Sequence, residues 1–183
     1  MVGSIELILG CMFSGKSTEI LRRVKRFQII DKMVCVISHK TDTRYSSEEV
    51  IVTHNGVTYP CIMLEHLNDI YKNDKYNLNY DVFVIEEGQF FDDLFDFVIN
   101  LADNKNKTVI VASLNGDFER KPFGEIYKLI SHAEKIVKLS ALCTMCKDGT
   151  SANFSKRITT NTEQISVGAG DQYIAVCRKH YLQ

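Results

Sequence analysis

The sequence lacks an excess of charge of either sign. Its 183 residues carry 22 lysines and arginines against 23 aspartates and glutamates, for a formal net charge of −1. A protein built mainly to coat nucleic acid would usually have an isoelectric point above about 9, whereas this sequence has a value near 6.5. We therefore expect no nucleic-acid partner.

Long apolar runs and targeting signals are also missing. No stretch approaches the roughly 18 apolar residues that a membrane span needs. The first ten residues, MVGSIELILG, have no basic start, and their apolar run is too short for a signal peptide. We expect a soluble, cytoplasmic protein without a membrane partner, large enough for one domain and a small appended module.

Short Val- and Ile-rich runs alternate with segments of helical periodicity. We expect residues 40–60 to form a mobile loop with a short hairpin around 53–60. This alternation is typical of an α/β fold, in which helices cover both faces of a parallel sheet. Pro122 would lie in the first turn of the helix expected over residues 122–133. The expected strands are 5–10, 33–38, 81–87, 108–114 and 135–142, and the expected helices are 17–30, 93–103 and 122–133.

Basic residues lie between the apolar residues of the first expected helix. Charged residues in this arrangement usually form a solvated face, and we favour that interpretation over a nucleic-acid patch. The residues concerned are Arg22, Arg23, Lys25 and Arg26.

A glycine-rich segment, GCMFSGKS, joins the first expected strand to the first expected helix. It fits the phosphate-binding pattern G-x-x-x-x-G-K-[ST] in the context that the pattern requires. Its glycines let backbone N–H groups turn toward phosphate oxygens, and the helix start adds the positive end of a dipole. Lys16 would neutralise the terminal phosphates, and Ser17 would lie near Mg²⁺. The predicted nucleotide-binding residues are Gly10, Cys11, Met12, Phe13, Ser14, Gly15, Lys16, Ser17 and Thr18.

Two adjacent glutamates, Glu86 and Glu87, follow the apolar run VFVI. Open α/β sheets bind their ligands at the carboxyl ends of their strands. Without the phosphate loop, an ordinary acidic surface pair would explain them equally well. With it, one carboxylate can hold Mg²⁺ and the other can take a proton from an acceptor hydroxyl. Because adjacent strand residues point to opposite sides, we expect the two to differ in role.

Four potential metal ligands follow the pattern C-x2-C…C-x2-H. A closed set of three cysteines and one histidine is typical of a tetrahedral structural zinc. A redox role for the first pair is the alternative, but it leaves the second pair unexplained. A metal clamp would let a small domain fold without a large core, so we place a domain boundary near residue 142. The predicted zinc ligands are Cys143, Cys146, Cys177 and His180.

In their order along nearly the whole chain, these motifs resemble those of the type II thymidine kinases, a family with cytosolic cellular and viral members. The resemblance implies a kinase that moves the γ-phosphoryl group of ATP to the 5′-hydroxyl of thymidine, with deoxyuridine as a further acceptor. The matching segments are MFSGKST (12–18), DTRYS (42–46), TH (53–54), EEGQFF (86–91), LNGDFERKPFG (114–124), FSKR (154–157), GDQY (170–173) and VCRK (176–179).

The resemblance also implies individual roles. Glu87 would be the catalytic base, Glu86 the acid near Mg²⁺, and Arg44 an arginine that approaches the phosphates during transfer, with Lys16 completing the catalytic set. For the two phenylalanines among the implied nucleoside contacts, residue patterns alone favour plain core packing. The implied contacts are Met12, Phe90, Leu114, Phe118, Gln164, Ile165, Ser166, Val167, Gly168 and Tyr173.

The fold that the resemblance implies is a RecA-like phosphate-loop domain over residues 1–142 and a zinc-bound lasso domain over 143–183 that covers the nucleoside site. The implied cofactors are Mg²⁺ with ATP and a structural Zn²⁺. A homotetramer and feedback inhibition by dTTP are further expectations from the same source.

The chain departs from the family pattern at several positions. Residues 147–153 make a longer connection than is usual after the first cysteine pair. Cys11 replaces a proline, Glu86 an aspartate and His180 a fourth cysteine, while Asn115, Asp117 and Glu119 alter the motif L-D-G-T-F-x-R-K-P-F.

Two other function classes stay open from the sequence. A nucleic-acid-binding ATPase with a zinc ribbon would share the phosphate loop and the metal pattern, although the near-neutral charge argues against it. A regulatory module without activity would have no need of Lys16, Ser17 and Glu87, all of which are present.

Overall fold

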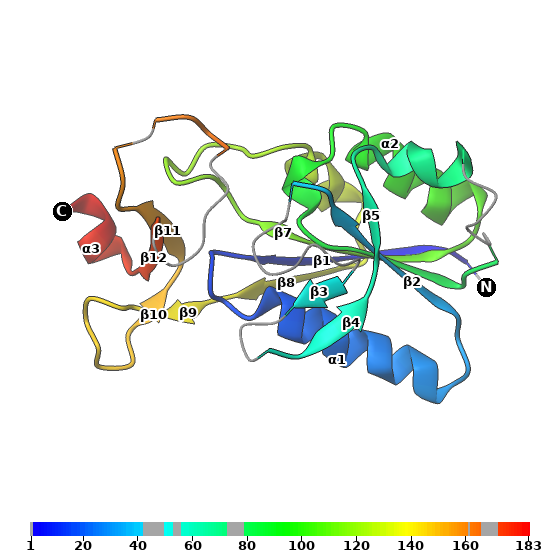
Figure 1. Cartoon of the computed structure of the whole chain (residues 1–183), viewed down its shortest axis with the longest axis horizontal. Coiled ribbons are helices and arrows are strands. Elements are labelled where there is room, and N and C mark those ends of the chain that lie inside the picture. Colours follow the sequence, from blue (N-terminus) through cyan, green and yellow to red (C-terminus); the bar gives the residue numbers. More distant parts are fainter. Residues whose placement is uncertain (1, 42–49, 53–55, 73–78, 161, 166–171) are drawn as a thin grey trace.

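A sheet of six parallel strands forms the centre of the protein (Figure 1). The computed structural model describes residues 2–41, 50–52, 56–72, 79–160, 162–165 and 172–183. Every strand pair in this sheet is parallel, as the sequence predicts. In spatial order the strands are β5 (Ile62–Leu64), β2 (Val34–His39), β6 (Val82–Ile85), β7 (Thr108–Leu114), β1 (Ser4–Gly10) and β8 (Lys135–Leu139).

Helices cover both faces of the sheet, which confirms the predicted layers. One face packs on α1 (Lys16–Ile29), and Figure 1 shows this helix on the side opposite α2. Because both faces are covered, β6 is buried along its whole length and reads as an uninterrupted apolar run. The second face packs against α2 (Leu94–Ile99), the π-helical turn Asn100–Asn104, and the 3-10 helices η1 (Leu67–Lys72) and η4 (Ile126–His132).

The helix predicted over residues 122–133 is shorter than expected and of another type. It is the 3-10 helix η4, which begins only at Ile126. Gly124 has a φ of 62°, and a Cβ there would lie 2.3 Å from the carbonyl oxygen of Gln89. The chain must therefore turn closely past Gln89 before the helix begins. The prediction of Pro122 in the first helical turn is wrong.

A hairpin lies within the predicted loop, where β3 (Val50–Val52) pairs antiparallel with β4 (Thr58–Pro60). This confirms the expected hairpin, while residues 42–49 and 53–55 of the loop lie outside the described residues. The sequence did not predict β5 or η1. An apolar run of three residues is too short for its periodicity to identify a strand.

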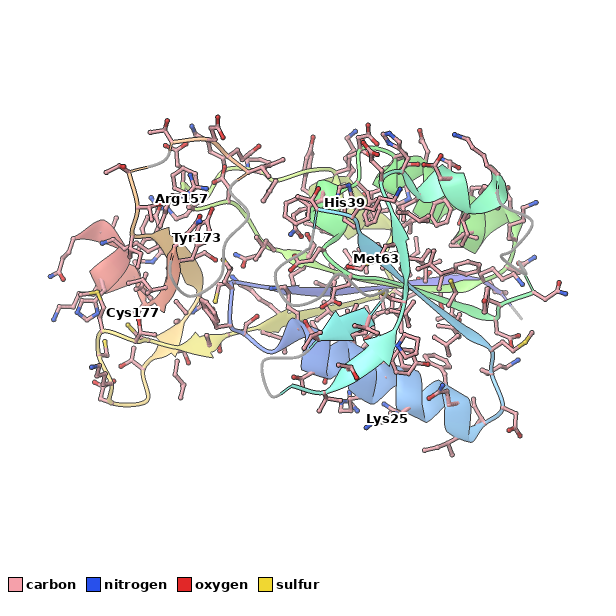
Figure 2. The ribbon with its side chains drawn as sticks, in the orientation of Figure 1. Lys25, His39, Met63, Arg157, Tyr173 and Cys177 are labelled. Carbon is pink, nitrogen blue, oxygen red and sulfur yellow. The ribbon has the colours of Figure 1, made fainter. Side chains whose placement is uncertain are left out.

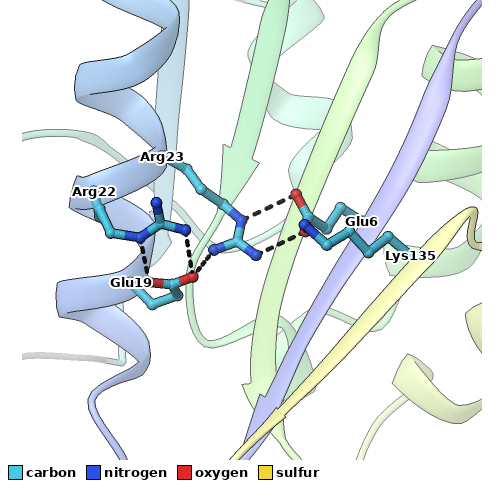
Figure 3. A network of polar contacts seen from close by, with 5 residues as sticks. All are labelled: Glu6, Glu19, Arg22, Arg23 and Lys135. Carbon is cyan, nitrogen blue, oxygen red and sulfur yellow. Dashed lines mark hydrogen bonds and ion pairs between the residues drawn. The ribbon is translucent and has the colours of Figure 1, made fainter.

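One basic residue of α1 is buried, which contradicts the prediction of a fully solvated face. Arg23 is only 4% exposed. Its guanidinium donates to both carboxylate oxygens of Glu6 in β1, at 2.7 and 3.0 Å, and also pairs with Glu19 (Figure 3). Lys135 of β8 binds Glu6 at 2.9 Å. The network ties α1 to two neighbouring strands, whereas Lys25 points away from the sheet (Figure 2).

Replacing Arg23 by methionine is expected to lower the free energy of unfolding at pH 7 by about 1 to 3 kcal/mol, because Glu6 loses its two-pronged partner. Burial raises the pKa of Glu6, but hydrogen bonds from Arg23 and Lys135 outweigh it and bring the pKa below 4.5. Hydrogen bonds from Arg22 and Arg23 lower the pKa of Glu19 to about 2. A carboxyl group whose pKa is lower in the folded than in the unfolded state stabilises the fold at pH values above its unfolded-state pKa. This contribution is lost as the pH falls through the folded-state pKa.

Urea unfolding of both proteins at pH 7 and pH 3 checks this expectation. The gap in stability between the wild type and Arg23→Met should shrink at pH 3, within the window from 4.5 down to about 2. Lys25→Met is the matched control, since Lys25 is an exposed residue of the same helix and points away from the sheet. A gap of equal size at both pH values would contradict the assigned role.

The C-terminal part of the chain forms a small group of elements beyond one end of the sheet (Figure 1). Its apolar cluster consists mostly of small residues and includes Cys11 from the phosphate loop, with Phe13 packed against it. This part therefore shares its core with the phosphate loop. A boundary between residues 142 and 143 stays a prediction. The elements are β9 (Ala141–Leu142), β10 (Ser151–Ala152), β11 (Phe154–Arg157), β12 (Tyr173–Val176) and α3 (Arg178–Leu182).

None of the helices in the described part of the chain combines the length and the apolar character needed to cross a membrane.

Candidate active site

The phosphate loop turns from β1 into α1 on two glycines that serve different purposes. At Gly10, a Cβ would lie 2.3 Å from Ser14 Oγ, which is too close for a side chain there without a shift. Gly15 has a φ of 84°, in the left-handed region, and α1 begins at the next residue, Lys16. Glycine adopts this region with little steric cost, so both positions shape the turn predicted from the sequence.

The same loop gathers groups that suit an anion. Lys16 Nζ lies 3.1 Å from the carbonyl oxygen of Cys11 and 3.4 Å from that of Gly10, so its charge lies over the loop. Ser14 Oγ is buried, and the described residues offer it no hydrogen-bond partner. The N-terminal end of the 14-residue helix α1 adds a positive partial charge. The loop is therefore suited to the phosphates of a nucleotide.

The two glutamates line the same pocket as this loop. Strand β6 ends at Ile85, so the alternation expected for adjacent strand residues does not apply. Glu87 has a φ of 53° and a ψ of 43°, a left-handed conformation that is costly outside glycine and occurs mostly where function requires it. Ser17 Oγ donates to Glu86 Oε1. Both carboxylates are nearly buried and line one pocket, with Glu86 on the serine side.

Gln89 fixes one oxygen of Glu87, a role that our reading of the sequence missed. Its side-chain nitrogen donates to Glu87 Oε2. Its oxygen accepts from Ser113 Oγ at 2.9 Å and from the backbone N–H of Leu114 at 3.0 Å. Gln89 is 3% exposed, so this chain of bonds is shielded from water. The available signal was a polar residue followed by two phenylalanines directly after the acidic pair, in EEGQFF.

A single pocket of about 1090 Å³, open to solvent, joins these groups to the residues predicted to bind a nucleoside. Met12 through Thr18, Glu86 and Glu87 line it together with residues distant in sequence. Gly10 and Cys11 are not on its surface. Arg44, Ser166, Val167 and Gly168 lie outside the described residues. The predicted nucleoside contacts that do line it are Met12, Phe90, Leu114, Phe118, Gln164, Ile165 and Tyr173.

The aromatic residues at this end form a wall and are not simply core. Phe90 and Phe118 are both partly exposed and face the pocket. The Phe90 ring meets the Phe123 ring edge-on, with centroids 5.6 Å apart. Flat apolar surfaces of this kind suit a planar base. The geometry therefore favours the pocket interpretation over plain core packing, and Phe123, Thr41, Val52 and Ser155 are further lining residues that sequence reasoning did not identify.

His39, at the end of β2, supports the edge of the pocket in its neutral form. Its Nε2 lies 3.1 Å from the carbonyl oxygen of Glu65, and its Nδ1 accepts the backbone N–H of Thr41 at 3.1 Å. Burial lowers the pKa of His39 below its usual value of 6.5. A neutral ring with the proton on Nε2 satisfies both contacts, so His39 holds the position of Thr41 at the pocket rim.

The predicted metal ligands come together from two ends of the small C-terminal part. Their ligand atoms, from Cys143, Cys146, Cys177 and His180, all lie within 4.8 Å of one another. His180 Nδ1 is 3.5 Å, 3.3 Å and 3.5 Å from the three sulfurs in sequence order. Two of the sulfurs, those of Cys146 and Cys177, are 3.8 Å apart.

These spacings test whether zinc fits. A tetrahedral zinc with its usual bond lengths places two sulfurs about 3.8 Å apart and a sulfur and a nitrogen about 3.5 Å apart. The cluster could hold zinc, and four converging ligands argue against a simple redox pair.

The comparisons with known proteins agree with this geometry. The sequence model of a family described as thymidine kinase matches residues 3–181. The chain is 43% identical to thymidine kinase 1 of Dictyostelium discoideum over 187 residues, which cover 99% of this chain and 78% of that protein. It is 44% identical to the thymidine kinase of Yaba monkey tumor virus (strain VR587) over 181 residues, 99% of this chain and 96% of the viral protein. It is 45% identical to the cytosolic thymidine kinase of Homo sapiens over 181 residues, 99% of this chain and 74% of the human protein.

Proposed function

The chain belongs to the thymidine kinase family, and we propose that it transfers the γ-phosphoryl group of ATP to the 5′-hydroxyl of thymidine, giving dTMP and ADP. Deoxyuridine is a second acceptor in this proposal. The observation that carries it is a single pocket lined by the phosphate loop, two buried carboxylates and an aromatic wall. One end suits the phosphates of ATP and the other suits a planar base, so the two reactants meet between them.

The residues at the phosphate end have different roles in phosphoryl transfer. Lys16 neutralises the terminal phosphates, and the backbone from Gly10 to Thr18 wraps around them. Ser17 and Glu86, which contact each other, would hold Mg²⁺, which offsets phosphate charge when it is bound. Arg44 approaches the phosphates as transfer proceeds.

Glu87 acts as the general base. Its carboxylate accepts the proton of the 5′-hydroxyl as that oxygen attacks the γ-phosphorus. Gln89 donates to one oxygen of Glu87, which orients the carboxylate toward the acceptor. Both residues are nearly buried, which strengthens the hydrogen bond that orients the carboxylate.

The aromatic end of the pocket holds the nucleoside. The rings of Phe90, Phe118 and Tyr173 provide apolar surface for the base. Backbone groups of residues 164–168 read the base edge, with Met12 and Leu114 around the ring. Neutral backbone donors and acceptors suit a pyrimidine, because its edge carries no charge.

The remaining expectations complete the proposal. The cluster of three cysteines and His180 binds one structural Zn²⁺. The protein forms a homotetramer, responds to dTTP as a feedback inhibitor, and binds no nucleic acid. Its location is the cytoplasm, an expectation supported by the human relative named cytosolic thymidine kinase.

A nucleoside panel with ATP and Mg²⁺ tests the proposal. We expect labelled phosphate to appear in dTMP, with a lower yield from deoxyuridine and none from purine nucleosides. The same assay without nucleoside, with and without single-stranded DNA, separates this function from that of a nucleic-acid ATPase. No dTMP together with ATP hydrolysis stimulated by DNA would overturn it.

A further inference from the structure

Strands β11 and β12 place Arg157 beside Tyr173. The two residues are register partners at the open end of this antiparallel pair, and the N–H of Ile158 donates to the carbonyl oxygen of Gln172 at 2.9 Å. Figure 2 shows Arg157 and Tyr173 close together beyond the end of the sheet. The connection from β11 to β12 therefore begins and ends at a hydrogen-bonded pair of residues.

The Arg157 guanidinium contacts three kinds of group at once, namely an aromatic ring, a hydroxyl and backbone carbonyl oxygens. Its central carbon Cζ lies 3.8 Å from the centre of the Phe118 ring. Its Nε donates to the Tyr173 hydroxyl at 3.0 Å. Its Nη1 donates to the carbonyl oxygen of Glu163 at 2.5 Å, and Nη2 reaches that of Gln164 at 3.4 Å. A planar fork with five N–H donors can meet all three, and a lysine ammonium cannot.

Asp117, in the loop that follows β7, binds the same segment as Arg157, residues 162–165. It is 7% exposed, and its Oδ1 accepts the backbone N–H groups of Glu119 at 2.9 Å and Lys121 at 2.8 Å, which shapes the turn that carries Phe118. Its Oδ2 accepts from Gln164 Nε2 at 2.8 Å. Asp117 stands where the family motif has threonine, whose single hydroxyl oxygen cannot serve all these donors as a carboxylate can.

We propose that Arg157 and Asp117 form a two-point clamp, which holds residues 162–165 against the Phe118 and Tyr173 wall and so sets how tightly the pocket grips its nucleoside. Asp117, Phe118, Tyr173 and Gln164 line the pocket, whereas Arg157 does not. Arg157 is therefore a positioning residue that acts through the lining residues. The clamp depends on the proposed function only for the identity of the ligand.

Kinetics of Arg157 variants give the first test. Arg157→Gln should raise KM for thymidine by about tenfold or more, with kcat and KM for ATP within about threefold of wild type, because the loss is confined to nucleoside binding. Arg157→Lys keeps the charge without the fork and should resemble Arg157→Gln. Arg26→Gln is the matched control, since it removes an exposed guanidinium of α1 that does not line the nucleoside pocket.

Backbone hydrogen exchange in the ligand-free protein gives the second test. In Arg157→Gln and Gln164→Ala, amides of residues 162–165 should exchange about tenfold faster while those of β1 and β7 stay unchanged. Gln164→Ala removes the Asp117 contact and leaves the turn at Phe118 in place. If the wild type phosphorylates no nucleoside but exchange responds in this way, the proposed function fails and the clamp stands.

Two results would overturn the clamp. One is exchange at residues 162–165 that matches the wild type in both variants. The other is an equal rise in KM for ATP and thymidine with faster exchange in the sheet, which would show that Arg157 only supports general stability.

Discussion

Replacing Glu87 by glutamine is expected to lower kcat for dTMP formation by at least about 100-fold, the lower range for a lost general base. An amide has the shape of the carboxylate but cannot take up the proton of the 5′-hydroxyl. The amide oxygen can still accept from Gln89, which binds the carboxylate in the native protein. Binding of ATP and thymidine should therefore stay close to that of the wild type.

Steady-state kinetics and equilibrium binding of both substrates separate these effects. Glu65→Gln is the control, because it makes the same chemical change at an exposed glutamate on the surface. A value of kcat within about threefold of wild type would show that the base is another group. Tight binding with lost turnover would leave Glu87 as the group that acts in the chemical step.

Removing the zinc proposed for the cysteine–histidine cluster is expected to unfold the C-terminal part and abolish nucleoside binding. Structural zinc sites contribute about 10 to 16 kcal/mol of apparent binding free energy, as much as the whole stability of many domains. The apolar cluster that would remain consists mostly of small residues, including Ala141, Ala152 and Ala175. It buries too little surface to hold β11, β12 and α3 alone.

Tyr181 carries this effect to the pocket. Tyr181 follows His180 of the cluster directly, and its hydroxyl donates to the carbonyl oxygen of Phe118 at 2.8 Å. If α3 is released from the proposed zinc site, Phe118 loses this support as well. The phosphate loop should respond as well, because Cys11 packs in the C-terminal apolar cluster and the N–H of Met12 donates to Ser155 Oγ at 3.0 Å.

His180→Ala gives the same experiment without a chelator. We expect the zinc content to fall well below one per chain and thermal unfolding to begin in the C-terminal part. His180→Cys supplies the ligand that the family pattern has at this position and should restore both properties. If His180→Ala kept its zinc and its stability, His180 would not be a ligand.

Local patterns were sufficient for much of this protein, because they depend on covalent spacing and on the period of secondary structure. The run VFVI predicts a strand with two buried faces, and β6 is buried throughout. GCMFSGKS predicts a phosphate loop, since Gly10 and Gly15 have roles that a short segment defines by itself. The cysteine and histidine spacing predicts a cluster, because each pair is brought to one place by a short turn.

Other features depended on contacts between distant segments. Arg23 reads as a solvated residue, but it is buried because Glu6, 17 residues away, lies beneath it in the sheet. The helix at 122–133 is shortened because Gly124 must pass the backbone of Gln89. The periodicity of either segment does not indicate these distant contacts. The sequence alone therefore predicts a solvated arginine and a full-length helix.

The sequence by itself determined the parallel α/β layers, the phosphate loop, the acidic pair and the cysteine–histidine cluster, because each is a local pattern with its own physical signature. Only the tertiary structure decided which residues orient them. Ser113 and Leu114 of β7 hold the Gln89 side chain that binds Glu87, and Arg157 meets Phe118 across 38 intervening positions. Such partners are chosen by the meeting of surfaces from separate elements, where burial makes an oriented hydrogen bond far more valuable than it is in water.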